Sequence, residues 1–343
     1  MTSVALLVVN YRSSALALDA IRTARAATAR PLQVVAVDNS VDASEADALR
    51  GGADVVIASP TNAGYAAAIN VGRRACDAEV IVVSNPDVLF AAGAIDALVD
   101  SGAAVAGPAL FWDDAHRWLL PPAELHTRAE VADRALASRW PAWARRRDRR
   151  RFRARLAFWK LKRTTRVRAI SGAVMAIRAK AFDDAGGFDE RFPLYFEEND
   201  FLRRVRGDIA YVPAARCRHL YNQSAAGSSE AAAAYARSER AYLEKWGGTL
   251  VKRWEVARAV AGSRGREVSE SHPPPETPLP RDPATFLTEA SPLPDFDTAA
   301  GSFADRDVPD DVWRAYRGEL LYMRALAADG RVLRSWTRAK MTG

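Results

Sequence analysis

Short runs of β-branched residues alternate with alanine-rich helical stretches over the first 110 residues of the sequence. The expected strands are 4–9, 33–37, 55–58, 80–83 and 105–106. The expected helices between them are 14–28, 43–50, 64–76 and 91–100. Because the strands are apolar at successive positions, both faces of their sheet must be buried, which is typical of parallel sheets. With right-handed crossovers, the pattern predicts an α/β fold with a Rossmann-like, mostly parallel sheet flanked by helices.

The later part of the sequence changes character several times. A basic segment, 139–168, is followed by further α/β pattern over 169–247. Residues 263–309 are rich in Pro, Ser, Asp and Glu, which predicts a linker or a wrapping tail. Residues 310–343 are expected to form a C-terminal helix, because apolar side chains recur there at three- and four-residue spacings. That helix would dock on the body of the protein or form a dimer contact.

The pattern over 169–247 predicts two strands and three helices. The expected strands are 169–177 and one beginning at 211. The expected helices are 179–185, one opened by the run 195–200 and ending near 206, and 231–246. His219 is expected in the loop after the second strand.

Charge and cysteine content exclude several classes of protein. Two cysteines among 343 residues are too few for a disulfide scaffold or a cysteine-based zinc site, and they suggest a reducing compartment. The segment 139–168 carries 14 Lys and Arg against one acid, so the remainder of a chain of net charge +7 is about −6. Basicity is therefore local, and a nucleic-acid-binding body is not expected. No apolar run is long enough for a membrane helix, and we expect a cytoplasmic protein.

Polar residues gather after the expected strands, at the edge where α/β sheets bind ligands. Asn10 follows the first strand and Asp38 the second, while Asn62 and Gly64 open the helix after the third. A carboxylate at such an edge can accept hydrogen bonds from a nucleobase or ribose. Free N–H groups at a helix start suit an anion, although Asp and Asn are also ordinary helix caps.

Asn85-Pro86-Asp87 follows the fourth strand, where a carboxylate could bind Mg²⁺ or Mn²⁺. The same tripeptide is also a common turn. His219 could be a metal ligand or a phosphate contact, or simply a hydrogen-bonded surface histidine.

An acidic run from Glu197 to Asp200 lies next to aromatic residues. Carboxylates that lie close together, beside apolar groups, have raised pKa values, which suits a general base near neutral pH. The other interpretation is that these acids stabilise the start of a helix through its dipole.

Taken together, these segments resemble the family 2 glycosyltransferases, in particular rhamnosyltransferase-like and galactofuranosyltransferase-like enzymes. The motifs that carry the resemblance are VNY, VDNS, NAGYAAAIN, SNPDV, SGAVMAIR, GGFDERFPLYFEENDFLRR and H-x-x-x-x-S, within residues 1–247. The resemblance implies a GT-A fold over 1–262, with a nucleotide-binding half (1–110), a basic insertion (139–168) and a catalytic half (169–247). It also implies a nucleoside-diphosphate-sugar donor, a divalent metal and inversion at the anomeric carbon.

The resemblance assigns roles to individual residues as well. It implies that Asp87, in the position of the family's D-x-D motif, and His219 bind Mg²⁺ or Mn²⁺. It implies that Glu198 is the catalytic base and that Asp200 supports the site. The residues implied to line the nucleotide-sugar pocket are Asn10, Asp38, Asn62, Gly64 and Asn85.

Substrate and partners are narrowed less sharply by the sequence. A deoxysugar such as rhamnose on dTDP is favoured by the resemblance, with UDP- and GDP-sugars open. The acceptor is a glycan, a lipid-linked glycan or a small molecule, in cell-envelope or secondary-metabolite synthesis.

The basic segment 139–168 is interleaved with aromatic residues. It could be a solvated arm or lid, or it could contact an anionic membrane surface, which would place the protein at the inner face of the membrane. The alternative to an enzyme is an inactive sugar-nucleotide or membrane-surface binding module. No G-x-G-x-x-G follows a strand, which argues against a dehydrogenase.

Overall fold

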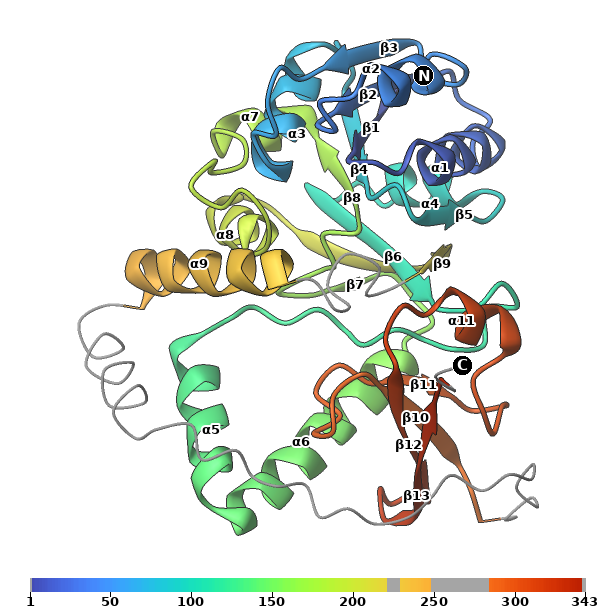
Figure 1. Cartoon of the computed structure of the whole chain (residues 1–343), viewed down its shortest axis with the longest axis vertical. Coiled ribbons are helices and arrows are strands. Elements are labelled where there is room, and N and C mark those ends of the chain that lie inside the picture. Colours follow the sequence, from blue (N-terminus) through green and yellow to red (C-terminus); the bar gives the residue numbers. More distant parts are fainter. Residues whose placement is uncertain (1, 221–228, 248–283, 341–343) are drawn as a thin grey trace. The chain divides into compact units, whose positions relative to one another are not determined.

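The computed structural model describes residues 2–220, 229–247 and 284–340, whose contacts divide the chain into two units (Figure 1). The first unit comprises Met1–His116, Pro122–Leu125 and Leu161–Glu239. The second comprises Arg117–Pro121, His126–Lys160 and Arg240–Gly343. All nine residues predicted for the functional site lie in the first unit.

The first unit is built on a mixed sheet, in which nine strands pair within the described part of the chain. The strands are β1 (Val4–Asn10), β2 (Leu32–Asp38), β3 (Val55–Ala58), β4 (Val80–Ser84), β5 (Val88–Phe90), β6 (Val105–Phe111), β7 (Thr165–Arg166), β8 (Val174–Arg178) and β9 (Ile209–His219). Their order is β3-β2-β1-β4-β8-β6-β9-β5, and β7 pairs with β9. Strands β1 to β4, β6 and β9 share one direction, whereas β5, β7 and β8 run against it.

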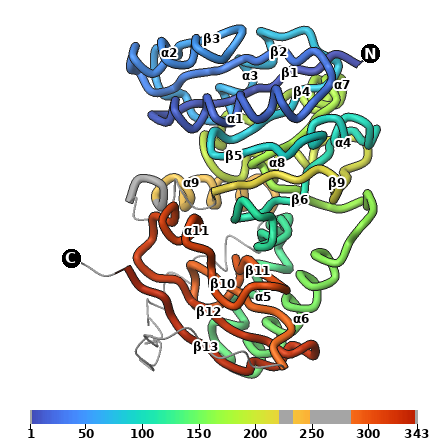
Figure 2. Tube along the Cα trace, turned by 90° about the vertical axis from the view of Figure 1, so that its right-hand side faces the viewer, coloured from blue at the N-terminus to red at the C-terminus, as the bar shows by residue number. Residues whose placement is uncertain are grey.

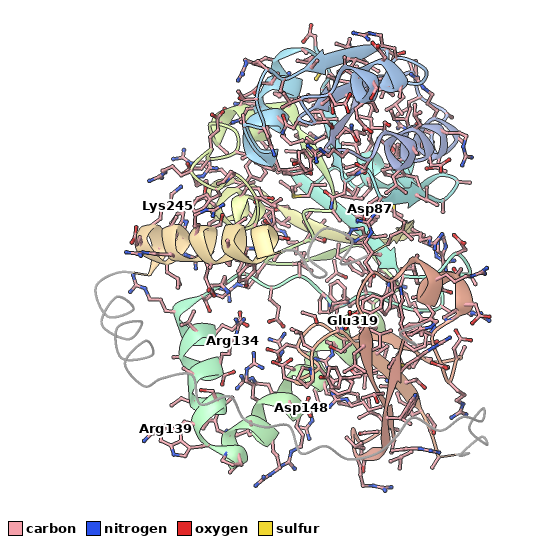
Figure 3. All side chains as sticks on the ribbon, viewed as in Figure 1. Asp87, Arg134, Arg139, Asp148, Lys245 and Glu319 are labelled. Carbon is pink, nitrogen blue, oxygen red and sulfur yellow. The ribbon has the colours of Figure 1, made fainter. Side chains whose placement is uncertain are left out.

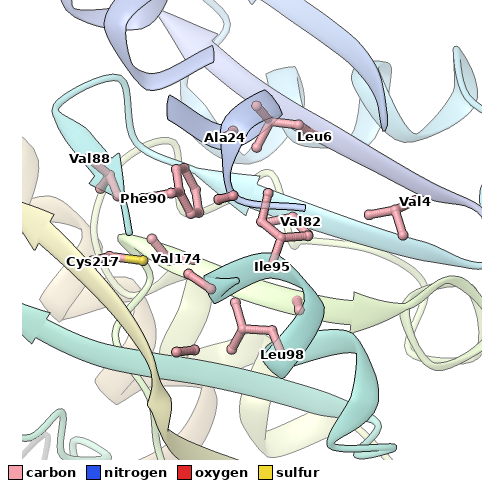
Figure 4. Close-up of a cluster of buried hydrophobic side chains, with 14 of the residues drawn as sticks. Val4, Leu6, Ala24, Val82, Val88, Phe90, Ile95, Leu98, Val174 and Cys217 are labelled. Atoms are coloured by element: carbon pink, nitrogen blue, oxygen red, sulfur yellow. The ribbon is translucent and has the colours of Figure 1, made fainter. Parts of the chain in front are cut away.

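Helices cover both faces of this sheet. They are α1 (Ser14–Ala26), α2 (Ala43–Leu49), α3 (Tyr65–Arg74), α4 (Ala94–Asp100), α7 (Ala179–Asp184) and α8 (Glu197–Arg204). A further helix, α9 (Ser229–Trp246), follows β9, and the boundary between the two units falls within it, after Glu239. Alternate residues of β1 enter opposite cores: Leu6 packs with α1 and α4, and Leu7 packs with α3, α7 and α8. Figure 4 shows the first of these two cores, around Leu6, Val82 and Ile95. Burial on both faces explains why the strands are apolar at every position.

The predicted alternation of strands and helices is confirmed in the first unit, and so is the mostly parallel sheet. The five strands expected before residue 107 are β1, β2, β3, β4 and β6. The strand expected at 169–177 is the shorter β8, which lies antiparallel between β4 and β6. Strand β5 was not expected, and His219 is the last residue of β9 rather than part of a loop. Cys76 and Cys217 are both buried and free.

The second unit joins two helices to a small antiparallel sheet. The helices are α5 (Arg128–Arg139) and α6 (Pro141–Trp159), and a short helix, α11 (Asp310–Ala315), lies near the end of the chain. The strands are β10 (Leu287–Ser291), β11 (Ala300–Ser302), β12 (Leu320–Leu326) and β13 (Val332–Ala339). The order of the four-stranded sheet is β11-β10-β12-β13. Both views show α6 alongside this sheet (Figures 1 and 2).

The predicted C-terminal helix over 310–343 is wrong. Among the described residues there, up to 340, only α11 is helical, and the chain continues as the hairpin of β12 and β13. The spacing that suggested a helix includes Leu320 and Met323, which lie on a strand whose buried residues include Leu321, Met323 and Ala325. Buried side chains also alternate along this segment with the period of two that is typical of a strand. The strand forms because the segment pairs with β10, about thirty residues earlier in the sequence. The dimer contact expected from that helix loses its basis.

The predicted boundaries of the basic insertion and the tail also change. Residues 284–309, expected in a linker or tail, contain β10 and β11, while 263–283 lie outside the described residues. The basic insertion belongs to the second unit as far as Lys160, not to a single domain over 1–262. Ion pairs hold it there: Arg155 Nη2 lies 2.8 Å from Glu289 Oε1, and both residues are buried.

Candidate functional site

The ends of β1 and β2 are joined by a buried polar cluster. Asn10 is fully buried, and its Nδ2 donates to Asp38 Oδ1 at 2.9 Å and to Glu45 Oε2 at 2.8 Å. Asn10 Oδ1 accepts from the backbone N–H and the hydroxyl of Ser13. Asp38 Oδ1 also accepts from Ser40 Oγ at 2.6 Å. Asn10 therefore braces Asp38 at the edge of the sheet, and both of its amide atoms bond within the chain.

Gly64 connects this edge to the acidic segment before α8. Its φ of +90° favours glycine, and an added Cβ would come within 2.6 Å of Pro193. The Gly64 carbonyl accepts from Asn39 Nδ2, while the N–H of Tyr65 donates to the Pro193 carbonyl at 2.6 Å. The N–H of Gly64 donates to Asn62 Oδ1. The N–H groups of Gly64 and Tyr65, at the start of α3, are thus bonded within the chain.

Asp87 and His219 lie together because β5 pairs with the end of β9. Val88 is opposite His219 in the antiparallel register, so Asp87 lies beside that histidine. Asp87 Oδ1 is 3.4 Å from His219 Nε2, and both side chains are about one-tenth exposed. Asp87 is labelled in Figure 3. Asn85 precedes it in the turn after β4, and its N–H donates to the Ala173 carbonyl.

Glu197 and Glu198 form an acidic pair at the start of α8. Glu197 is buried, and no hydrogen-bond partner for its Oε2 is found among the described residues. Burial, and then the charge of Glu198, raise the pKa of Glu197 well above its usual value. Burial also raises the pKa of Glu198, whose Oε1 accepts from Asn199 Nδ2 at 3.0 Å. Gly172 provides space for the Glu198 side chain, because a Cβ at position 172 would lie only 3.1 Å from Glu198 Cγ.

The backbone before this pair is strained. Tyr195 and Phe196 both have φ of +68°, which is uncommon for residues with a Cβ. The surroundings hold them in place: the rings of both residues pack on Tyr235 of α9, and Ser238 Oγ donates to the Leu194 carbonyl at 2.7 Å. The acidic pair is thereby presented at a fixed place rather than on a loose loop.

Asp200 lies behind the site rather than in it. It is fully buried and accepts from Arg204 Nε at 2.7 Å, and Arg204 also donates to the carbonyls of Ala185 and Gly187. Asp200 therefore orients Arg204 and ties α8 to the turn at 185–187.

Tyr65 is the residue that the sequence reasoning missed. Its hydroxyl is buried, and no hydrogen-bond partner for it is found in the described part of the chain. Burial raises the pKa of Tyr65 well above its usual value, and the nearby charges of Glu197, Glu198 and Asp87 add to the shift. Tyr65 therefore lies among the three carboxylates of the site. In the sequence, an aromatic residue that follows a glycine at the start of a helix looks like an ordinary core residue, so nothing there indicates a functional role for Tyr65.

The structure thus brings most of the predicted residues into one connected set. Contacts run from Asp38 and Asn39 through Gly64 and Tyr65 to the acidic pair. From there they run through Gly172 and Ala173 to the turn that carries Asp87. A raised-pKa carboxylate, an orphaned hydroxyl and an Asp–His pair converge there. Such a set can take up a proton and hold an anionic group near a cation.

The Asp87–His219 pair fits a metal that keeps open positions. Within the described ranges, no group of three or more His, Cys, Asp and Glu residues could hold a metal ion. A carboxylate and an imidazole are both ligands of divalent metals, and Mg²⁺ commonly takes one or two carboxylates while substrate phosphates fill other positions.

Among the described residues, no helix combines the length and the apolar character that crossing a membrane requires.

Comparison with known proteins gives one family and a few relatives. The profile described as "Glycosyltransferase like family 2" matches residues 2–241. An N-acetylglucosaminyl-diphospho-decaprenol L-rhamnosyltransferase of Mycobacterium tuberculosis, from strains CDC 1551 and H37Rv, is 29% identical over 221 residues. The match covers 56% of this chain and 68% of that protein.

Two solved structures are similar at a lower level. GalNAc-T7 with UDP, GalNAc and Mn²⁺ is 16% identical, with a TM-score of 0.46, over 69% of this chain and 47% of its own. A mannosyltransferase of Pyrobaculum calidifontis with GDP-Man and Mn²⁺ is also 16% identical, with a TM-score of 0.43, over 65% of this chain and 58% of its own. This chain therefore spans less than two thirds of either protein.

Proposed function

This chain belongs to glycosyltransferase family 2 and has the GT-A fold, and on that premise we propose that it transfers a sugar with inversion from a nucleoside diphosphate to an acceptor hydroxyl. The observation that carries the proposal is the convergence of Glu198, Tyr65 and the Asp87–His219 pair. That the chain belongs to glycosyltransferase family 2 does not depend on this convergence of side chains.

Glu198 is the base in this proposal. The acceptor oxygen forms a bond to the anomeric carbon, and its proton passes to the Glu198 carboxylate. The bond between the anomeric carbon and the diphosphate oxygen breaks, and its electron pair leaves with the diphosphate. Burial raises the pKa of Glu198, which makes its carboxylate a stronger proton acceptor than an exposed one. Glu197, buried beside it, helps to set that environment.

Asp87 and His219 would hold the divalent metal, Mg²⁺ or Mn²⁺. When bound, such an ion supplies positive charge that stabilises the departing diphosphate. The mixed oxygen and nitrogen donor set suits Mn²⁺ in particular, because imidazole is a better ligand for Mn²⁺ than for Mg²⁺.

The nucleoside side of the donor would bind at the edge formed by β1, β2 and the start of α3. Asp38 is the carboxylate for the nucleoside, held by Asn10 and Ser40. Asn62, Gly64 and Asn85 would line the same pocket, with Gly64 setting the path of the chain. We propose a dTDP-linked deoxysugar such as rhamnose as donor, with UDP- and GDP-sugars as the alternatives to be tested.

The acceptor we propose is a glycan linked to a lipid through a diphosphate. The name of the mycobacterial relative describes such a substrate. The proposal extends that chemistry to this chain, and the acceptor hydroxyl would lie next to Glu198.

The experiment that tests the proposal measures thermal stability with UDP, dTDP, GDP and CDP, each with and without Mn²⁺. A ligand at 100 times its dissociation constant stabilises the folded state by about 2.7 kcal/mol. We expect one nucleoside diphosphate to raise the melting temperature in a manner that depends on Mn²⁺. If none does so, the Asp38–Asp87 site is not a donor site, and an inactive relative becomes the better interpretation.

Replacing Tyr65 by Phe tests the hydroxyl among the carboxylates. The change removes one buried hydroxyl without a partner, so the melting temperature should stay the same or rise. If that hydroxyl bonds to substrate, the transfer rate should fall about tenfold. The matched control is Tyr211→Phe, a buried tyrosine near the start of β9, which should leave the rate unchanged. Full activity in Tyr65→Phe would remove Tyr65 from the site.

A further inference from the structure

Helix α6 has arginines on two opposite faces, and the structure treats the two faces differently. On one face, Arg147 and Arg151 pair with Asp297, and Arg155 pairs with Glu289. Arg147 and Arg155 are buried. These three arginines, four residues apart in turn, hold α6 against the second unit's sheet and its connecting loop. Their charges are neutralised and do not contribute to a basic surface.

The other face of α6 is exposed and carries unneutralised charge. Arg145, Arg149 and Arg153 recur every four residues, and Arg146 lies beside them on the same side. All four are exposed, and none forms an ion pair with a carboxylate in the described part of the chain. The only hydrogen bond that their guanidinium groups form within the described residues is from Arg149 Nε to the Arg145 carbonyl. Asp148, labelled in Figure 3, lies away from these four arginines on the same helix and accepts a hydrogen bond from Arg324.

Two exposed tryptophans lie at the start of the same helix. Trp140 precedes α6 and is 51% exposed. Trp143 in its first turn is 36% exposed, and its Nε1 donates to Asp133 Oδ1 at 2.9 Å, so its N–H is bonded within the chain. Tryptophan is favoured at the boundary between lipid headgroups and acyl chains, where its ring meets apolar groups and its N–H meets polar ones. A duplex of nucleic acid offers the exposed indoles no comparable apolar layer.

We propose that the exposed arginine face of α6, Arg145, Arg146, Arg149 and Arg153, together with Trp140, docks the protein on an anionic phospholipid bilayer. A row of arginines on one helix face matches the negative surface of such a membrane, and Trp140 would enter the headgroup layer. This surface goes beyond the proposed transfer reaction, since it belongs to the second unit and does not involve the site residues.

The test is binding of the full-length protein to vesicles. We expect binding to vesicles of phosphatidylcholine with about one third phosphatidylglycerol, and weak binding to phosphatidylcholine alone. The variant R145Q/R146Q/R149Q/R153Q should bind the anionic vesicles several hundred-fold more weakly, at about fivefold for each arginine. Its melting temperature should not change, because none of the four forms an ion pair within the described residues.

The matched control removes the same charge from elsewhere. Arg74, Arg206, Arg331 and Arg334 are exposed, and their replacement by Gln also lowers the net charge by four. Vesicle binding retained in this control and lost in the α6 variant supports the proposal. Binding retained in the α6 variant, or lost equally in both, overturns it. The proposal is also overturned if the α6 variant no longer binds a DNA duplex that the wild-type protein binds, while it still binds the vesicles. Because no substrate is present, the outcome is independent of the transfer reaction.

Discussion

Replacing Glu198 by Gln is expected to lower the transfer rate by about 10²- to 10⁴-fold, the usual contribution of a general base. The amide keeps the size of the side chain and can still contact Asn199, but it cannot accept the acceptor's proton. The nucleoside diphosphate should bind with unchanged affinity, since Asp38 and Asp87 are untouched. The measurements are the transfer rate with saturating donor and the thermal shift with the nucleotide. Near-normal turnover would exclude Glu198 as the base.

The pH dependence gives this prediction a second readout. Because a base acts in its deprotonated form, the rate should fall as the pH drops through the raised pKa of Glu198, above the range of an exposed Glu. That acidic limb should disappear in Glu198→Gln.

Glu197→Gln is the matched control for Glu198→Gln and should retain far more activity. The folded state favours protonated Glu197, so the stability this group contributes is present at low pH and is lost as the pH rises through its raised pKa. Glu197→Gln should therefore gain stability relative to wild type above that pKa. Equal inactivation by both substitutions would show that the pair acts as one unit.

Replacing Asp87 by Asn is expected to abolish the Mn²⁺-dependent part of nucleotide binding. Asp87 is the carboxylate of the proposed metal pair, and its replacement removes the charged oxygen that lies 3.4 Å from His219 Nε2. Loss of groups that merely support metal ligands already costs about 10- to 100-fold in affinity, so a ligand itself should cost at least as much. Titration of Mn²⁺ in the presence of the nucleotide measures this, together with the transfer rate.

Asp114→Asn is the control for the Asp87 variant. Asp114 Oδ1 pairs with Arg218, the neighbour of His219 in the chain, and its side chain is largely exposed. Removing this charge changes the local potential without removing a proposed ligand, so Mn²⁺ dependence should persist. If Asp87→Asn still shows a Mn²⁺-dependent shift, the metal does not bind at Asp87, and chelation experiments would have to locate it elsewhere.

The parts of the fold that sequence could predict are those that depend on local pattern. Continuous apolar runs predict buried parallel strands such as β1 and β4. The residues that directly follow these runs are then expected at the edge of the sheet. Strand β5 is three residues long, and its role comes from pairing with β9, more than a hundred residues later. No local pattern specifies such a pairing, although the motifs on either side of it suggested that Asp87 and His219 act together.

Neither the hairpin of β12 and β13 nor the difference between the two faces of α6 could be predicted from the sequence, for a different reason. In the hairpin, apolar residues fit a helical and a strand period equally well until the partner strand is known. In α6, arginines occupy both faces, so no hydrophobic pattern separates Arg155 from Arg153. Only the location of Glu289 and Asp297, well over a hundred residues away, decides which arginines are buried.

The buried arginines of α6 also limit where the chain can be shortened. The family match ends at residue 241, yet Arg155 within it pairs with Glu289 beyond it. Arg147 and Arg151, which also pair with Glu130, share a second partner beyond it, Asp297. A truncation to the matched region would leave these arginines beside an uncovered apolar surface, and losing one partner of a buried ion pair alone costs about 3–5 kcal/mol. Residues 126–160 and 284–340 therefore have to be kept or removed together, as one exchangeable module.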